Sequence, residues 1–255
     1  MLLEYANSDI PWLYISFSTL CWTTLYFIIY GLIHKPEHSV RIVTVCHALS
    51  SMCLCFYICV IKSPFPLFPW GVGQQNTWWH DLGMTYSLGY FLFDLTWSLY
   101  MQSEKQIMLA HHVVSIFGFF TTLRIGVSGC EILATTGGAE VSNPFLQLRW
   151  LLQHEQRLDT EFGKFVEHMF LLVWFVVRMG IGTVLYIVVV LSSQPPLIIK
   201  FGANCMFTVS CAFTYGIIQY YRKRFGNIFL LPRYFLKELP TFVRTRWKSF
   251  HFKLI

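Results

Sequence analysis

Seven predominantly apolar stretches run along this chain, and each is close to the length that a helix needs to cross a bilayer. About 20 residues, at about 1.5 Å of rise per residue, cover the hydrocarbon thickness. The stretches are residues 12–33, 42–61, 83–101, 107–124, 130–152, 167–191 and 197–221. Only 13% of the residues are charged, about half the fraction of a typical soluble domain. The sequence therefore predicts an all-α, polytopic membrane protein with about seven transmembrane helices.

The fifth stretch is the least apolar of the seven, because it contains the sequence TTGGAEVSNP at residues 135–144. Polar groups that face lipid are costly, so this helix must face the protein interior or a wet cavity. The loops support counting it as a span, since the richer basic loops then fall on one side of the membrane. Those loops contain Lys35, Arg41, Lys105, Arg157, Lys164 and Arg222–Arg224. Basic loops mark the cytosol, so we expect a luminal or external N-terminus and a cytosolic C-terminus.

The chain after the last apolar stretch is basic and rich in aromatic residues, which predicts an amphipathic tail on an anionic leaflet. Its candidate surface residues are Arg222, Lys223, Arg224, Arg244, Arg246 and Lys248. Nucleic acid is not expected as a partner, because no nucleic-acid-binding motif is present and the rest of the chain lies in the bilayer. The eight cysteines show no metal-ligand spacing, so no metal site is predicted.

Ionisable residues inside apolar spans are costly, and each one indicates a functional position. This chain has Asp94, His111, His112, Glu140 and Arg178 within its predicted spans. The helical rise places them at depths of about 6–17 Å from the cytosolic ends of their helices, between that interface and the midplane. The sequence therefore predicts one polar pocket that opens toward the cytosol.

Helical spacing adds further residues to this pocket, because positions three, four or seven apart share a face. The residues added on this basis are Tyr90 beside Asp94, Ser115 beside His111, and Asn143 and Gln147 beside Glu140. Together with Arg178, these four residues form the predicted lipid or acyl pocket.

A histidine with a carboxylate partner can act as a general base or nucleophile near neutral pH. The catalytic candidates are therefore His111, His112, Asp94 and Glu140. If the protein transfers acyl groups, we expect His111 to be the nucleophile with Asp94 as its partner, and His112 to pack against a neighbouring helix. Structural roles remain open for both carboxylates: Asp94 as a hydrogen-bond acceptor that joins helices, and Glu140 in an ion pair with Arg178.

Two other ionisable residues in the spans are predicted to lie outside the pocket. His47, in the second span, is expected to be structural or interfacial. Arg149 lies near the cytosolic end of the fifth span, so its head group is expected to extend to the interface.

Two motifs resemble the TLC domain, namely HHVVS at residues 111–115 and AEVSNPFLQ at residues 139–147. That domain is shared by ceramide synthases, the translocating-chain-associated membrane protein and several lipid-homeostasis proteins. The resemblance covers residues 35–225 and implies a TLC-type six-helix barrel. Residues 1–34 would then form the luminal end and first transmembrane helix, and residues 226–255 the basic aromatic cytosolic tail.

The ceramide-synthase signature begins His-His-x-x-Thr and continues His-Asp-x-Ser-Asp-x-x-Leu-Glu. Its first part is met by His111, His112 and Ser115, with Ser in place of Thr. The second part falls on residues 139–147, where Ala139 replaces the His, Glu140 and Asn143 replace the two Asp, and Gln147 replaces the Glu. One His and two acidic groups are thus absent, which argues against ceramide synthesis while a lipid-sized cavity is still expected.

Three functions follow from these expectations. The first is lipid homeostasis through binding of a lipid or acyl chain, without a cofactor. The second is acyl transfer of the ceramide-synthase type, with acyl-CoA as cosubstrate, and the third is handling or trafficking of membrane proteins. The expected partners are membrane lipids. Acyl-CoA as a further ligand and a second copy of the chain in a homodimer remain alternatives. The expected location is the endoplasmic reticulum or another secretory-pathway membrane, and the plasma membrane stays open.

The predicted topology can be tested with glycosylation sequons introduced into two loops. A sequon within residues 62–82 should be modified in cells, because this loop is expected to face the lumen. A sequon within residues 153–165 should stay unmodified, and a mobility shift on endoglycosidase treatment measures both. The reverse pattern would contradict the assigned orientation.

Overall fold

The computed structural model describes residues 10–226, and helices make up most of this part of the chain. The helices are α1 (Trp12–Ile33), α2 (Pro36–Phe56), α3 (Trp78–Met101), α4 (Gln106–Ile125), α5 (Gly129–Glu140), α6 (Asn143–His154), α7 (Glu161–Val173), α8 (Gly182–Leu191) and α9 (Leu197–Phe225). The π-helical segment η1 (Tyr57–Lys62) continues α2, and a second π-helical segment, η3 (Trp174–Ile181), joins α7 to α8. The short 3-10 turn η2 (Pro69–Gly71) lies between η1 and α3.

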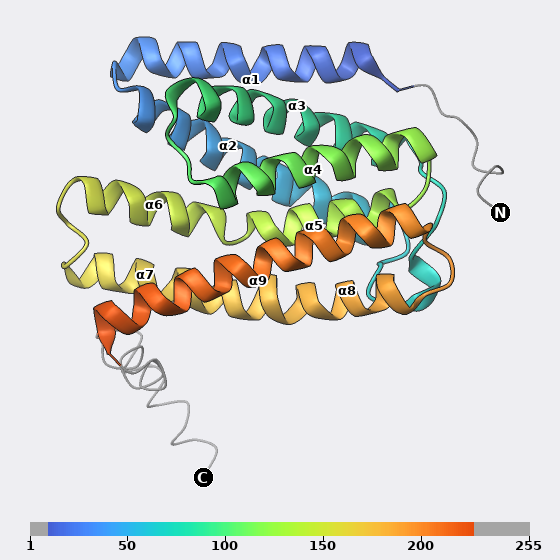
Figure 1. Ribbon diagram of the computed structural model, residues 1–255. Coiled ribbons are helices and arrows are strands. Elements are labelled where there is room, and N and C mark those ends of the chain that lie inside the picture. The colour runs from blue at the N-terminus through green and yellow to red at the C-terminus, as the bar shows by residue number, and fades with distance from the viewer. Residues whose placement is uncertain (1–9, 227–255) are drawn as a thin grey trace, which may run out of the picture.

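The helices lie side by side along one common direction, so the molecule is an elongated bundle (Figure 1). The segments α7, η3 and α8 form one continuous rod, and α5 and α6 follow each other end to end (Figure 1). Helix α1 lies at one edge of the bundle, where it packs against α3 and α2. Because α5 and α6 together replace a single rod, residues 10–226 cross the length of the bundle with seven helical rods.

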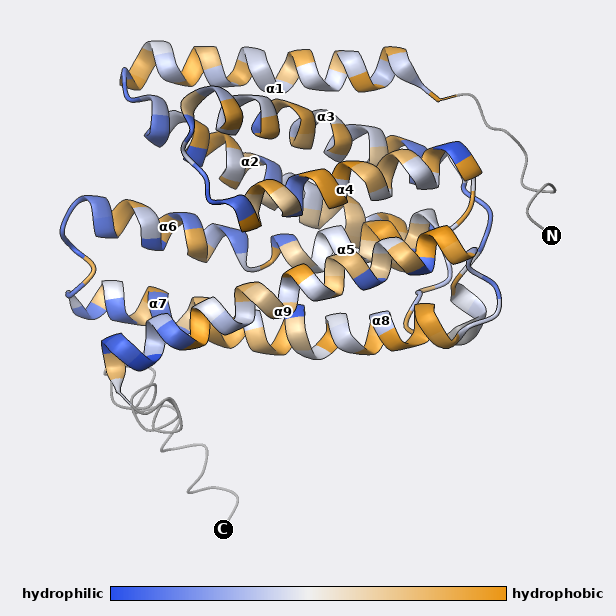
Figure 2. Cartoon of the chain, in the orientation of Figure 1, coloured by the Kyte–Doolittle hydropathy of each residue, from blue (hydrophilic) through white to orange (hydrophobic). Residues whose placement is uncertain are grey.

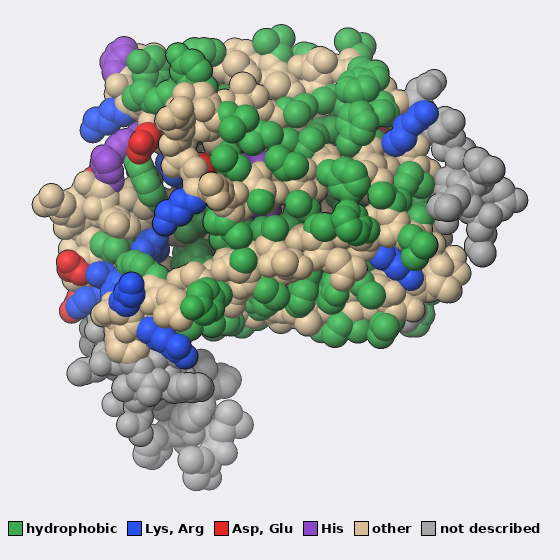
Figure 3. All heavy atoms as spheres, viewed as in Figure 1, with side chains coloured by type: hydrophobic (Ala, Val, Ile, Leu, Met, Phe, Trp, Pro, Cys, Tyr) green, Lys and Arg blue, Asp and Glu red, His purple; other side chains and the backbone are tan. Residues whose placement is uncertain are grey.

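Within the described part of the chain, five helical segments are long and apolar enough to cross a membrane. They are Trp12–Ile33, Pro36–Lys62, Gln106–Ile125, Glu161–Leu191 and Leu197–Phe225. Hydrophobic residues occur along all of these helices (Figure 2), and their side chains cover much of the face drawn in Figure 3. In water such a surface would aggregate, whereas lipid tails are a suitable solvent for it. The all-α, polytopic membrane fold predicted from the sequence is therefore confirmed.

The fifth predicted span, residues 130–152, is wrong as a single helix, because α5 ends at Glu140 and α6 begins at Asn143. Pro144 lies in the first turn of α6, where its missing N–H leaves no intrahelical bond unmade. The Ser142 hydroxyl donates to the Ala139 carbonyl oxygen at 3.0 Å and so satisfies one of the last carbonyls of α5. The polar sequence that weakened the hydropathy signal thus forms a break inside the bundle.

Two predicted spans also begin later in the sequence than the observed helices do. Helix α2 begins at Pro36 rather than at residue 42, since proline is well suited to the first helical turn. Helix α3 begins at Trp78 rather than at residue 83, because Thr77 and His80 form a reciprocal capping box at its start. Hydropathy could not locate either helix start, because the first turns of both helices contain polar residues.

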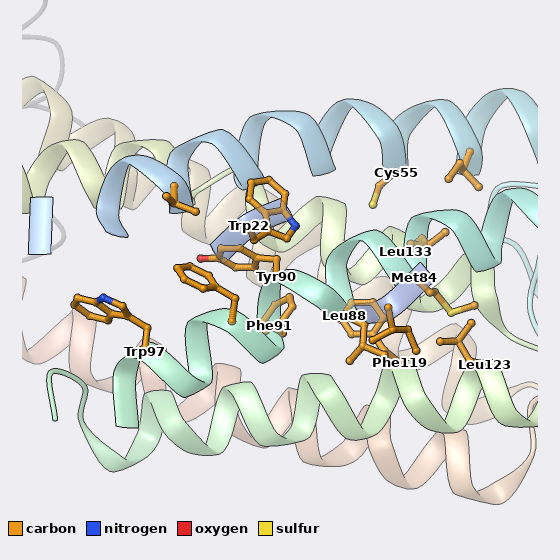
Figure 4. Packing of buried hydrophobic residues seen from close by; sticks show 14 of the residues in the cluster. Trp22, Cys55, Met84, Leu88, Tyr90, Phe91, Trp97, Phe119, Leu123 and Leu133 are labelled. Carbon is orange, nitrogen blue, oxygen red and sulfur yellow. The ribbon is translucent and has the colours of Figure 1, made fainter. Parts of the chain in front are cut away.

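The main apolar core lies among α1, α2, α3, α4 and α5 (Figure 4). Trp22 of α1 meets the ring of Tyr90 of α3 edge-on, with 5.6 Å between ring centroids. Farther along α3, Leu88 and Phe119 of α4 are buried in the same cluster. This core fixes α3 in the bundle, and α3 carries Tyr90 and Asp94 on the side that faces away from lipid.

Helices α1 and α3 approach closely at Gly89. A Cβ atom built on Gly89 would lie 2.5 Å from Ser18 Cβ and 2.8 Å from the Thr19 backbone nitrogen. The Ser18 hydroxyl also donates to the Tyr86 carbonyl oxygen at 2.9 Å, which ties the two helices together beside the contact. A side chain at position 89 would therefore force α1 away from the core.

We expect Gly89→Ala to lower the stability of the protein by about 1–3 kcal/mol, the usual cost of an overpacked contact. The matched control is Gly31→Ala on α1, where a new Cβ would meet nothing within 4 Å. That change should be neutral or stabilising, because alanine favours a helix over glycine by about 1 kcal/mol. Thermal melting in detergent measures both, and equal melting temperatures for the two variants would refute the close contact.

Candidate functional site

A cavity of about 420 Å³ lies between the helices near the end of the bundle that carries residues 102–105. This volume falls within the range of small-molecule and lipid sites, about 300–1,000 Å³. Eight of the residues predicted for the site line it, namely Tyr90, Asp94, His111, His112, Glu140, Asn143, Gln147 and Arg178. On the face drawn in Figure 3, a hollow lies between the N-terminal end of α4 and the C-terminal half of α9, with basic side chains beside it.

Asp94 is the centre of a first polar group within the cavity. His112 Nε2 lies 3.6 Å from Asp94 Oδ2, and the Tyr90 hydroxyl lies 3.1 Å from the same oxygen. The Tyr90 hydroxyl is also 3.0 Å from Thr44 Oγ1, so α2, α3 and α4 meet at this carboxylate. A carboxylate held in this way can orient the His112 ring.

The predicted pairing of His111 with Asp94 is wrong, because His112 is the histidine that faces Asp94. His111 lies instead against aromatic rings, 6.0 Å from Phe91 and 6.0 Å from Phe213 between ring centroids. Adjacent residues project about 100° apart on a helix, so the rotation of α4 about its own axis decides which of the two histidine rings faces α3. Both histidines nonetheless line the cavity.

Glu140 is the centre of a second polar group, at the end of α5. Asn143 Nδ2 donates to Glu140 Oε2 at 2.6 Å, and His47 Nδ1 lies 3.8 Å from Glu140 Oε1. The His47 ring is fully buried and stacks on Tyr90 with 3.8 Å between ring centroids. His47, predicted to lie outside the pocket, thus connects the Glu140 group to the Asp94 group through Tyr90.

Arg178 lies in the same cavity, on the π-helical segment η3. Its guanidinium carbon lies 4.6 Å from the centroid of the Trp174 ring, in a cation–π contact. Among residues 10–226, no ion pair within 4.0 Å involves Arg178, so the pair with Glu140 that the sequence left open is not a direct contact, although the charges of the two groups interact across the cavity. Matched depth along two helices did not bring their charged groups into contact, because depth says nothing about the distance across the bundle.

Ser115 lies outside the main cavity, contrary to its predicted place in the pocket. Its hydroxyl donates to the His111 carbonyl oxygen of the preceding turn at 2.8 Å. Its side chain lines a separate cavity of about 80 Å³ between α4, α5 and α9. The face of α4 that carries His111 therefore lines the main cavity at His111 but not one turn later at Ser115.

The rim of the cavity carries ion pairs that sequence reasoning did not find. Arg41 Nη2 pairs with Glu104 Oε1 at 2.9 Å, and Arg41 Nη1 donates to Gln147 Oε1 at 3.4 Å. The fully buried carboxylate of Glu167 pairs with Arg149 Nε at 3.3 Å and with Arg224 Nε at 2.6 Å. A lone Glu167 in an apolar run of the sequence was the available signal for this cluster.

Two of these arginines were predicted to be elsewhere. Arg149, expected at the membrane interface, lines the cavity and lies 4.3 Å from the centroid of the Tyr220 ring. Arg224, predicted for the membrane-surface tail, joins α9 to α7 through Glu167 instead. The tail residues Arg222 and Lys223 are exposed at the end of α9, and Arg244, Arg246 and Lys248 lie outside the described residues.

The arrangement offers two chemical possibilities. The His112–Asp94 pair could act as a general base or as an oriented nucleophile. The aromatic and aliphatic walls of the cavity, which include Phe91, Phe213 and Ile217, could hold an apolar chain. Among residues 10–226, no group of three or more His, Cys, Asp or Glu side chains is arranged to hold a metal ion.

Comparison with known families gives one match to this chain. The family model described as the TLC domain matches residues 37–222, which run from the first turn of α2 to the last turns of α9. All of the cavity-lining residues fall within this range. Comparison with solved structures finds no match.

The Glu167 cluster should be the most sensitive polar contact at the rim. We expect Glu167→Gln to destabilise the protein by about 3–5 kcal/mol, because it leaves two partly buried arginines without their carboxylate. The control is Glu161→Gln on the same helix, where the side chain is exposed and a change of about 1 kcal/mol or less is expected. Melting temperatures in detergent compare them, and a Glu167 variant as stable as the control would contradict this role.

Proposed function

This chain belongs to the TLC-domain family, and on that premise we propose that it binds a lipid or an acyl chain in the cavity beside Arg178 and acts in lipid homeostasis. The observation that carries the proposal is one cavity with a polar end and apolar walls inside a multi-pass membrane bundle. An amphiphile needs both features, because its headgroup seeks hydrogen bonds and its chain seeks apolar contact.

Two smaller cavities extend the space that a chain would occupy. A cavity of about 110 Å³ shares Arg178 with the main cavity and continues along α5, α8 and α9. The cavity of about 80 Å³ beside Ser115 shares Ala203 and Met206 with that second cavity. The three spaces follow one another along the bundle, which supports a bound chain that runs from the polar end toward the opposite end.

The site of action that we propose is the endoplasmic reticulum or another secretory-pathway membrane. The loop charges support a luminal N-terminus and a cytosolic C-terminus, so the polar cavity would open toward the cytosol. Within the family, the sequences LGYFLFDL, MLAHHVVSI and SNPFLQLRW resemble TLC domain-containing protein 5. We place the chain beside that member as part of the same proposal.

The second candidate function is acyl transfer from acyl-CoA, and the contact between His112 and Asp94 favours it. An acyl-enzyme would need an unprotonated histidine nitrogen, and Asp94 could hold the ring in the required orientation. Ala139 stands where the ceramide-synthase signature has its third histidine. With that histidine absent, lipid binding is the function that the residues support better.

Native mass spectrometry of the purified protein tests the proposal. We expect wild type to carry a defined lipid, and expect Gly216→Phe to carry less, because Gly216 lines the cavity and has open space where a side chain would begin. Gly31→Phe is the matched control, since it also enters open space but lies outside every described cavity on α1.

Three outcomes would count against the proposal. Wild type without bound lipid would contradict it directly. Equal lipid in the Gly216 and Gly31 variants would place the lipid outside the cavity. A mass increment that persists after denaturation would show a covalent acyl group and favour the acyltransferase.

A further inference from the structure

Three arginines line the main cavity, and two of them are already paired with carboxylates. Arg41 pairs with Glu104 at 2.9 Å, and Arg149 pairs with Glu167 at 3.3 Å. Arg178 is the third, and within residues 10–226 its guanidinium makes neither a hydrogen bond nor an ion pair within 4.0 Å. The guanidinium lies over the face of the Trp174 ring. A guanidinium keeps its charge in proteins and has five N–H donors in a fixed plane, so Arg178 presents an unused donor set to the cavity.

The nearest acidic group does not require Arg178. Glu140 accepts a hydrogen bond from Asn143 at 2.6 Å and has the His47 ring 3.8 Å away. Asp94, the other acidic group deep in the cavity, has Tyr90 and His112 as its partners. Both carboxylates thus have closer side-chain partners of their own. The charge of Glu140 acts on Arg178 across the cavity, but the N–H donors of Arg178 are left for a group that enters the cavity.

Arg178 lies at the junction of the polar main cavity and the apolar second cavity. It lines both the main cavity of about 420 Å³ and the second cavity of about 110 Å³. The second cavity is walled mainly by apolar side chains, among them Ile181, Leu185 and Met206. Arg178 also lies on the π-helical segment η3, a form of helix that is rare and often found at functional sites.

We propose that Arg178 binds the oxyanion of an anionic amphiphile, a carboxylate or a phosphate, while the apolar chain of that amphiphile enters the second cavity. A planar guanidinium matches both oxyanions with two parallel hydrogen bonds. The unpaired Arg178 beside the apolar space carries this inference, which rests on the proposed lipid-binding function and specifies the class of lipid. A neutral lipid would leave the guanidinium desolvated and without partners.

The test compares ligands that differ only in charge. Lipid-stripped full-length protein in neutral detergent is titrated with radiolabelled palmitate and hexadecanol, and separately with palmitoyl lysophosphatidate and monopalmitoylglycerol. Each pair shares a chain and differs in the oxyanion. Wild type should bind the charged member of at least one pair at least tenfold more tightly, and the pair with the larger preference identifies carboxylate or phosphate as the source.

Variants then assign that preference to one residue. Arg178→Met should remove it while leaving the affinity for the uncharged ligands unchanged, and Arg178→Lys should keep part of it, since the charge remains without the planar fork. The control is Arg222→Met, which removes an exposed charge on α9 outside the cavity and should bind as wild type does.

The outcomes separate this inference from the function on which it rests. Equal affinities for the charged and uncharged ligands in wild type would overturn the inference and leave lipid binding intact. The same holds if the preference survives in Arg178→Met. Failure of wild type to bind any of the four ligands would overturn both. The wild-type comparison alone decides the matter if Arg178→Met does not fold.

Discussion

Charged side chains placed within the hydrocarbon need partners inside the protein, because lipid offers them none. The described bundle meets this requirement at one end, where Asp94, Glu140 and Glu167 each hold hydrogen bonds or ion pairs from a neighbouring helix or turn. The apolar core cluster among α1 to α5 contains no charged side chain. Glu131, a buried carboxylate at the start of α5, follows the same rule, because the Gly73 N–H donates to it.

The break between α5 and α6 is part of this arrangement. A continuous helix over residues 130–152 would fix Glu140 and Asn143 one turn apart on an uninterrupted rod. The turn at Val141 and Ser142 instead lets Asn143 donate to the Glu140 carboxylate at the start of a new helix. Irregular backbone at membrane depth is tolerated where it lines a cavity rather than lipid, and the cavity beside Glu140 and Asn143 provides that setting.

Hydropathy and loop charge predicted the all-α membrane fold, since both depend only on composition along the chain. Depth and helical spacing together identified eight residues that line one cavity, because helical rise and turn are nearly constant. Contacts across the bundle could not be predicted in this way. Rotation about each helix axis decides that His112 rather than His111 meets Asp94, and helix-to-helix distance decides that Arg178 does not pair with Glu140.

The departures from the ceramide-synthase signature take on meaning in this geometry. Ala139, which stands at the position of the lost histidine, lines the apolar cavity that also contacts Arg178. Asn143, which stands at an aspartate, is a donor to Glu140 and so adds no further negative charge near that arginine. With Ala139 and Asn143, the surroundings of an anionic amphiphile are more apolar and less acidic than they would be with the histidine and aspartate of the signature.

The most direct measurement is a cryo-electron microscopy structure of the protein in lipid nanodiscs, with attention to the density between Arg178 and the second cavity. The account predicts an elongated density whose polar end lies within hydrogen-bonding distance of the Arg178 guanidinium and whose chain follows α5 and α8. A cavity that holds only water, or an Arg178 side chain paired directly with Glu140, would contradict it.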